Sequence, residues 1–224
     1  MRRAGFTLLE MIVAAAIFTA VVAGAYALFD GSRRLAARAE ARAELLQTAR
    51  AALRAIETDL RGAVMSGTAY DTGFIGTDGG SEKEPLDVLD FVSVASPSAE
   101  ASMDGYKDAT KARRSDLSKI SYWIEKDELK PAHGLVRERL GTMLPPESRT
   151  RREEDVEAVS TDVVGLNLRY YDGQWRDAWN SQQSRTMPRA VEATVRVRRG
   201  EEIEAHTARF YLPVAAETPE ATPP

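Results

Sequence analysis

An apolar run near the start of the chain limits what the chain can fold into. Between Phe6 and Phe29 only Glu10 carries a formal charge. As an α-helix with a rise of ~1.5 Å per residue, this stretch would span about 36 Å, which is enough to cross the hydrocarbon core of a bilayer. We therefore expect a membrane-spanning helix at residues 6–29.

Glu10 is the unusual residue of this run. A carboxylate at the centre of a membrane segment costs about 2.5–3.5 kcal/mol, and such groups usually have a partner. Glu10 stands near the N-terminal end, where the cost is smaller, but a partner is still expected. Cleavage between Gly5 and Phe6 would leave a cationic amine on Phe6. The amine of a parallel, axially shifted neighbour could then pair with Glu10.

These residues also match a known processing signal. The sequence from Gly5 to Glu10, behind a leader with Arg2 and Arg3, resembles the class III signal of type IV prepilins and type II secretion pseudopilins. Every part of the motif is present in order, which makes it specific. The resemblance implies that a prepilin peptidase cuts after Gly5 and N-methylates Phe6. It also implies that Glu10 assists the assembly of subunits.

Two ordinary targeting segments explain part of the same sequence. The small residues 23–25 would suit a signal peptidase that cuts before Tyr26, and a plain signal anchor would need no assembly role. The long apolar run and the presence of Glu10 argue against a signal peptide. The charges conflict, because Arg2 and Arg3 favour a cytoplasmic N-terminus whereas four arginines at residues 33–42 favour the opposite topology. The complete cleavage motif favours the cytoplasmic N-terminus.

The composition of the chain limits its function classes. The 224 residues carry a formal charge of −4, so there is no global basic field for nucleic acid. The absence of Cys excludes disulfides, Cys-ligated zinc and a thiol nucleophile. No spacing joins His133 and His206 as metal ligands, and none indicates a hydrolase triad. We expect neither an enzyme nor a cofactor or metal site.

A polar but helix-rich segment follows at residues 30–61. Its apolar residues recur every three or four positions and form one stripe, which predicts an amphipathic helix packed on the sheet of its own domain. The stripe consists of Leu46, Ala49, Leu53, Ile56 and Leu60. Leu46, Leu53, Ile56 and Leu60 are also candidate contacts with neighbouring subunits.

After residue 61 the pattern changes from helix to strand. The glycine-rich residues 62–84 predict a mobile connector. Strands are predicted at residues 86–94, 117–125, 166–171, 191–197 and 203–214. Charged residues within 135–140 predict an edge strand or an exposed face. The proline-rich end, residues 215–224, is predicted to be disordered.

The C-terminal block adds to the resemblance. Residues 168–173, Trp175, Trp179 and residues 187–195 resemble the closing strands of the minor pseudopilin J family of the type II secretion system. The resemblance implies an α+β, type IV pilin-like fold, in which a long N-terminal helix with a membrane half and an amphipathic half packs on antiparallel β-sheet. Trp175 and Trp179 are either core residues or anchors of an interface.

The family implies a role in assembly. We expect the chain to join sister minor pseudopilins of the I and K classes in a tip complex that starts or caps the pseudopilus, a periplasmic fibre that helps to export folded proteins. The expected organisation is a leader at 1–5, an inner-membrane helix at 6–29, an amphipathic helix at 30–61, a periplasmic β-rich domain at 62–214 and a tail at 215–224. Two alternatives remain open: a minor pilin of a type IV pilus, and a periplasmic enzyme cut before Tyr26.

Overall fold

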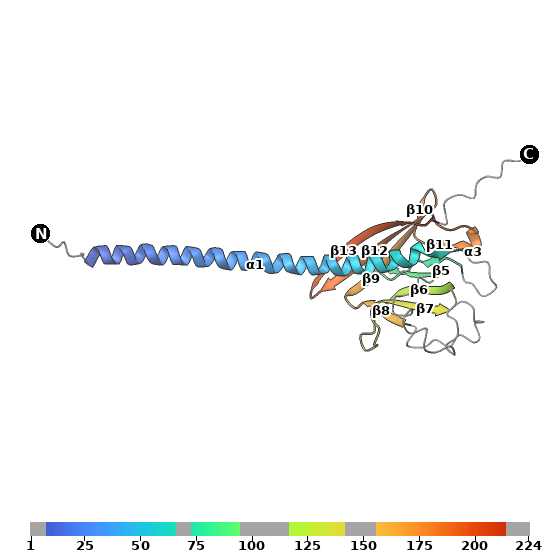
Figure 1. Cartoon of the computed structure of the whole chain (residues 1–224), viewed down its shortest axis with the longest axis horizontal. Coiled ribbons are helices and arrows are strands. Elements are labelled where there is room, and N and C mark those ends of the chain that lie inside the picture. Colours follow the sequence, from blue (N-terminus) through green and yellow to red (C-terminus); the bar gives the residue numbers. More distant parts are fainter. Residues whose placement is uncertain (1–7, 66–72, 95–116, 142–155, 214–224) are drawn as a thin grey trace, which may run out of the picture. The chain divides into compact units, whose positions relative to one another are not determined.

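The computed structural model describes residues 8–65, 73–94, 117–141 and 156–213. A single long helix, α1 (Leu8–Arg61), is followed by short and long antiparallel strands (Figure 1). This arrangement confirms the predicted α+β fold. The chain forms two compact units, residues 1–44 and residues 45–224. The leader at 1–5 and the tail at 215–224 lie outside the described residues.

The part of α1 in the first unit exposes its apolar side chains. By length and composition, α1 could cross a membrane, and none of its most apolar stretch is buried. No proline interrupts residues 8–61, and Ala and Leu are strong helix formers. The apolar stretch of α1 up to Phe29 therefore has the properties expected of a membrane segment.

The end of α1, in the second unit, buries one stripe of side chains. The buried apolar residues are Leu45, Ala49, Ala52, Leu53, Ile56 and Leu60. The predicted stripe is therefore correct, except that Leu45 is buried where Leu46 was expected and Leu46 is half-buried. Ile56 has an exposed fraction of 0 %, and complete burial of such a side chain stabilises the fold by about 1.5–3 kcal/mol.

Gly62 lets the chain turn directly from α1 into the sheet. Its carbonyl oxygen accepts a hydrogen bond of 2.8 Å from the amide of Val94. A Cβ at residue 62 would lie 2.5 Å from the hydroxyl of Ser93 and 2.9 Å from the carbonyl oxygen of Val94. Only glycine allows so close an approach, and strand β1 (Ala63–Val64) then pairs with β5 (Val88–Val94).

The larger sheet has seven strands. Six of them follow the order β11-β2-β5-β6-β7-β8, and the seventh, β1, pairs with β5 outside this order. Its remaining strands are β2 (Ile75–Thr77), β5 (Val88–Val94), β6 (Leu117–Glu125), β7 (Gly134–Gly141), β8 (Val156–Ser160) and β11 (Trp179–Asn180). Two short strands, β3 (Gly80–Ser81) and β4 (Glu84–Pro85), form a separate hairpin. The predicted strand at 117–125 coincides with β6.

Two predictions about this sheet are wrong. The described part of residues 62–84 forms strands rather than a mobile connector. Its glycines have a packing role there, because a Cβ at Gly76 would collide with the hydroxyl of Tyr170. The second error concerns β7, which is not an edge strand but pairs with both β6 and β8. Its charged residues Arg137 and Arg139 bind a buried carboxylate instead of facing solvent.

The smaller sheet has the order β10-β9-β12-β13. Its strands are β9 (Val163–Tyr171), β10 (Trp175–Arg176), β12 (Ala190–Arg199) and β13 (Glu202–Tyr211). The register places Tyr170, Val191 and Phe210 in one row, and all three are buried. Since side chains alternate across a strand, the neighbouring row belongs to the opposite, outer face. A short helix, α3 (Ser181–Ser184), lies between β11 and β12 and is capped by Asn180.

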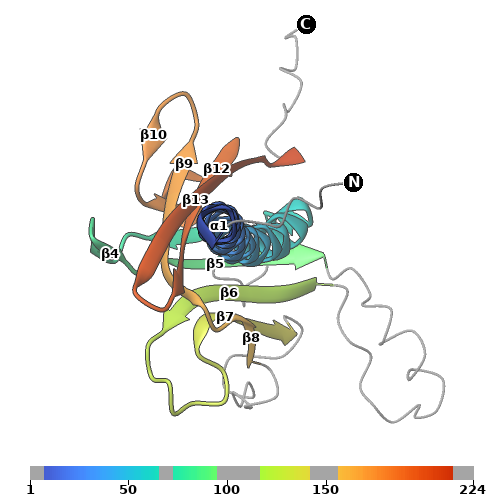
Figure 2. The ribbon, with the colours of Figure 1, turned by 90° about the vertical axis from the view of Figure 1, so that its left-hand side faces the viewer.

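The end of α1 shares one core with both sheets (Figure 2). Asp87, just before β5, joins the two sheets directly. Its carboxylate accepts a hydrogen bond of 3.0 Å from the amide of Gly79 and one of 2.6 Å from the amide of Leu168 in β9. Burial raises the pKa of Asp87, and the two amides oppose this effect. A single side chain thus links the segment that leads into β5 of the larger sheet to β9 of the smaller sheet.

Removal of buried volume at α1 is expected to destabilise the second unit. Ile56→Ala should lower the free energy of unfolding by about 2–5 kcal/mol, because it removes transfer energy and leaves a cavity. The matched control is Leu129→Ala, since Leu129 is 95 % exposed, and it should change stability by less than about 0.5 kcal/mol. Urea unfolding of the full chain in detergent measures the free energy of unfolding of both variants. Equal losses for the two variants would contradict the packing of α1 described above.

Candidate assembly site

The processing residues Gly5 and Phe6 lie outside the described residues. Glu10 lies in the first turn of α1 and is exposed. Its neighbours Leu8, Leu9 and Met11 are exposed as well. An acidic side chain in the first turn of a helix is stabilised by the partial positive charge at the helix N-terminus. The carboxylate therefore stands at the position where a second positive charge, such as an amine, would add to that field.

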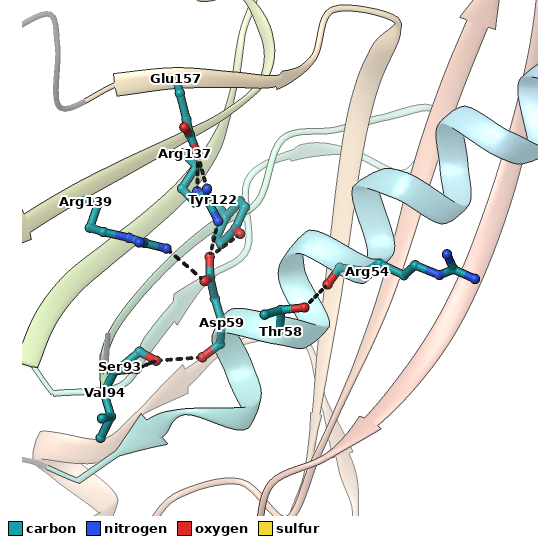
Figure 3. Close-up of polar contacts among 9 residues, drawn as sticks. All are labelled: Arg54, Thr58, Asp59, Ser93, Val94, Tyr122, Arg137, Arg139 and Glu157. Carbon is teal, nitrogen blue, oxygen red and sulfur yellow. Dashed lines mark hydrogen bonds and ion pairs between the residues drawn. The ribbon is translucent and has the colours of Figure 1, made fainter. Parts of the chain in front are cut away.

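A second carboxylate of α1 is buried at the other end of the helix. Asp59 is 6 % exposed, and its side chain points from the last turns of α1 toward β6 and β7 (Figure 3). Its Oδ2 accepts a hydrogen bond of 2.6 Å from Tyr122 Oη and one of 2.9 Å from Arg137 Nη1. Its Oδ1 lies 3.2 Å from Arg139 Nη2. We call these four residues the Asp59 cluster.

The strand register brings the partners of Asp59 together. Tyr122 of β6 lies directly opposite Arg137 of β7, and Arg137 lies opposite Glu157 of β8. Arg139 stands two residues further along β7, so its side chain emerges on the same face. Arg137 also donates through Nε to Glu157 Oε1 at 2.5 Å. The two carboxylates therefore hold Arg137 between them.

The surroundings of Tyr122 favour its role as a donor. Burial raises the pKa of Tyr122 far above its ordinary value, and the negative charge of Asp59 raises it further. The phenol consequently keeps its proton at all ordinary pH values and donates a hydrogen bond to Asp59. A second contact fixes the backbone here, because Ser93 Oγ donates to the carbonyl oxygen of Asp59 at 2.8 Å.

Sequence reasoning missed the Asp59 cluster. Asp59 lies beside Leu60 and three residues after Ile56, so its place on the buried side of α1 was visible in the helical period. The two arginines of β7 alternate with Val136 and Glu138, which also puts them on one face. A carboxylate on a buried helix face and two arginines on one face of a strand are complementary. That complementarity was the available signal.

The predicted contact residues on α1 divide into two groups. Leu53, Ile56 and Leu60 are buried in the core of the second unit. Leu46 is half-buried, and with Leu53 it lines a groove of about 300 Å³ between the end of α1 and β13. The groove also has Arg50 and Arg54 in its lining. Of these candidates, Leu46 is the one that offers substantial surface to another molecule.

The two tryptophans differ in the same way. Trp179 is buried, and its Nε1 donates to the carbonyl oxygen of Thr186 at 3.2 Å. Trp175 is half-buried on the outer face of the smaller sheet, where its ring centroid lies 5.2 Å from that of Tyr171. Trp179 is thus a core residue, and Trp175 is available at the surface.

Among the described residues, no group of three or more His, Asp or Glu side chains could hold a metal ion.

A long apolar helix whose end packs on antiparallel sheet defines a type IV pilin-like subunit. Two family comparisons then specify which one. The prokaryotic N-terminal methylation motif matches residues 1–26, and the family of type II secretion system (T2SS) protein J matches residues 27–208. The chain therefore belongs to the type II secretion protein J family and is a minor pseudopilin. Comparisons with curated proteins and with solved structures gave no match.

Membership in this family answers several questions left open by the sequence. The match over residues 27–208 favours a secretion pseudopilin over a pilus subunit. The family is a structural component of the secretion machinery, a member of a pseudopilus with other pseudopilins, and a substrate of prepilin peptidase. Together with the apolar helix, it makes this chain a membrane-anchored protein.

Loss of the buried charge in the Asp59 cluster is expected to destabilise the domain. Asp59→Asn should lower the free energy of unfolding by about 3 kcal/mol, because it removes the buried carboxylate that pairs with Arg139 and Arg137, and of these two only Arg137 keeps a second partner, Glu157. The control is Glu57→Gln, which breaks the exposed pair of Glu57 with Arg61 and should cost less than about 1 kcal/mol. Urea unfolding of the full chain in detergent measures each loss.

A double-mutant cycle with Tyr122→Phe tests the geometry of the cluster. Asp59→Asn and Tyr122→Phe should together lose less stability than the sum of their separate losses, because the first weakens and the second removes the same charge-assisted hydrogen bond. Additive losses would show that Asp59 and Tyr122 do not interact as described.

Proposed function

We propose that this minor pseudopilin joins sister subunits of the I and K classes in the tip complex of the pseudopilus, where it starts or caps the fibre. In this role the leader 1–5 is removed after Gly5, and Phe6 becomes the N-methylated terminus. Residues 6–29 remain in the inner membrane. The amphipathic helix 30–61 and the β-rich domain 62–214 stand in the periplasm, with the tail 215–224 at the end.

The observation that supports an assembly role most directly is the position of Glu10. It is the one formal charge between Phe6 and Phe29, and it lies in the first turn of α1. A carboxylate surrounded by apolar side chains gains most from an opposite charge supplied by another molecule in the membrane. The amine of Phe6 in a neighbouring subunit is such a charge. Pairing would thus fix the axial offset between two subunits.

Two of the candidate contact residues suit direct contact with a sister subunit. Leu46 in the groove beside β13 and Trp175 on the smaller sheet are both half-buried, so each has apolar surface that a partner could cover. Direct contact through Leu53, Ile56, Leu60 or Trp179 would require the core in which they lie to rearrange. We therefore assign the direct contacts to Leu46 and Trp175.

The first test of processing is the mass of the mature protein. Protein extracted from the membrane of a host that has prepilin peptidase should yield an N-terminal peptide that begins at N-methylated Phe6. Intact mass and peptide mass spectrometry measure this directly. A chain that begins at Tyr26 would remove the assembly helix and contradict the proposal, and an intact Met1 terminus in that host would indicate a simple anchor.

The second test separates processing from assembly. Glu10→Ala should leave cleavage after Gly5 intact but reduce crosslinking to the I- and K-class pseudopilins and reduce secretion, because the charge that pairs with the neighbouring amine is missing. Glu10→Asp, which keeps the charge, is the matched control and should retain more of both. Normal secretion by the Glu10→Ala strain would count against the charge pair.

A further inference from the structure

Three arginines follow the point where the apolar part of α1 ends. The apolar run stops at Phe29, and Arg33, Arg34 and Arg38 come next on the same unbroken helix. Residues 31–39 contain no Asp or Glu, so this stretch is positive in a chain whose formal charge is −4 overall. If the N-terminus is cytoplasmic, as proposed, these arginines stand on the side of the membrane where positive residues are rarer. The assembly role does not account for them.

The helix sets the height of each arginine above the apolar run. With a rise of ~1.5 Å per residue, Arg33 and Arg34 lie about 6–7.5 Å beyond Phe29, and Arg38 lies about 13.5 Å beyond it. The headgroup layer on each side of a bilayer is roughly 5–7.5 Å thick. Arg38 is therefore within a Debye length, about 8 Å, of that layer. Side chains of a helix point back toward its N-terminus, so all three guanidinium groups are directed toward the headgroups.

Two aromatic residues before the arginines support this position. Tyr26 is 73 % exposed, and tyrosine is typical of the level at which a helix leaves the membrane. The guanidinium carbon of Arg33 lies 5.9 Å from the centroid of the Phe29 ring, which is within the range of cation–π contacts. Arg33 thus lies along the helix toward the apolar run, with its stem on apolar surface and its charge at the boundary.

The guanidinium groups are available to an anion. All three arginines are exposed. Arg33 and Arg38 form no ion pair with the residues that the structure describes. Arg34 pairs with Asp30 at 2.7 Å, but its side chain is 74 % exposed, and an exposed pair of this kind is weak enough for another anion to compete. Three arginines against one aspartate leave two positive charges uncompensated between residues 30 and 38.

The spacing of Arg34 and Arg38 indicates the kind of ligand. Residues four apart are neighbours on one face of a helix, and two positive charges there repel each other. A phosphate group between them removes this repulsion and accepts hydrogen bonds from both guanidinium groups, whose planar shape suits phosphate oxygens. The apolar side chains directly below the arginines, such as the exposed Leu28, suit acyl chains. The ligand that satisfies both parts is a phosphate group attached to apolar chains.

We propose that Arg33, Arg34 and Arg38 bind the phosphate groups of anionic phospholipids at the surface where the apolar part of α1 leaves the membrane. Arg34 and Arg38 hold one phosphate group between them. Arg33 lies about 100° around the helix from Arg34 and binds a second headgroup. Each arginine near an anionic surface strengthens binding about fivefold.

The site also sets the depth of the helix. Glu10 precedes Phe29 by 19 residues, a helical distance of about 28 Å, which is close to the thickness of the hydrocarbon core. With the arginines held at one surface, Glu10 lies near the other. This depth favours the pairing of Glu10 with a neighbouring amine, which rests on the proposed function. The binding of lipid does not depend on that pairing.

Lipid selectivity is measured on the full chain in nanodiscs of phosphatidylcholine mixed with phosphatidylglycerol. Native mass spectrometry gives the ratio of the two lipids that the released protein retains, relative to their ratio in the disc. The site predicts that phosphatidylglycerol is enriched at least about fivefold, the effect of a single arginine. R33Q, R34Q and R38Q together should abolish the enrichment. Circular dichroism of each variant verifies that the chain is folded.

The matched control is R50Q. Arg50 is exposed on the same helix, but it lies about 31 Å beyond Phe29, several Debye lengths from the headgroups. R50Q should therefore leave the enrichment of phosphatidylglycerol unchanged. An equal loss of enrichment in R50Q and in the triple variant would overturn the assignment to Arg33, Arg34 and Arg38.

Three other outcomes would overturn the proposal. The first is the absence of enrichment in the unsubstituted chain. The second is a loss of enrichment when inorganic phosphate replaces chloride at constant ionic strength, which would assign the site to free phosphate. The third is a triple variant that keeps its enrichment but loses crosslinking to the I- and K-class pseudopilins, which would assign the arginines to a sister subunit. Selectivity is measured on the isolated subunit, so its failure is distinguishable from failure of the assembly role.

Discussion

The buried carboxylate of Asp59 is the constraint on which the second unit depends. A charge that is removed from water must be paired, or its burial costs several kcal/mol. Asp59 meets this requirement with Tyr122, Arg137 and Arg139, which come from two adjacent strands. Apolar packing alone would tolerate a slide or a rotation of a helix by part of a turn. The hydrogen bonds of Asp59 have defined lengths and directions, so they select one position of the helix end on the sheet.

The smaller sheet depends on the same helix end through packing rather than charge. Val191, Ala193 and Val195 of β12 belong to the core that also contains Ile56 and Leu60. The larger sheet therefore defines the orientation of the helix, and the smaller sheet contributes much of the apolar area that stabilises the unit.

Much of this architecture was predictable from periodicity. The helical stripe at residues 46–60 and the strand at 117–125 were both identified, because a period of 3.6 or of 2 extends over enough residues to be unambiguous. The processing signal from Gly5 to Glu10 can likewise be recognised from consecutive residues. Features of this kind are predictable because they depend only on residues that are close in sequence. The family itself was recognised from the signal and the closing strands together.

What could not be predicted depends on residues far apart in the chain. Strands β2 and β3 are three and two residues long, too short for any period, and β2 lies where only a glycine at residue 76 leaves room for Tyr170 of β9. The charged strand β7 looked like an edge because its arginines face Asp59, which lies 78 residues from Arg137. Burial of Trp179 and partial exposure of Trp175, four residues apart, likewise follow from their places on different sheets.

The link through Asp87 has a consequence for how the unit opens. Its carboxylate bonds the backbone of residue 79 on one side and of Leu168 on the other, and its own amide donates to Leu166 at 3.0 Å. The two sheets cannot separate at this point without breaking the hydrogen bonds between Asp87 and β9. Separation would also remove apolar side chains of both sheets from their common core, so the slowest amide protons of both sheets should exchange together, as those of a single cooperative unit.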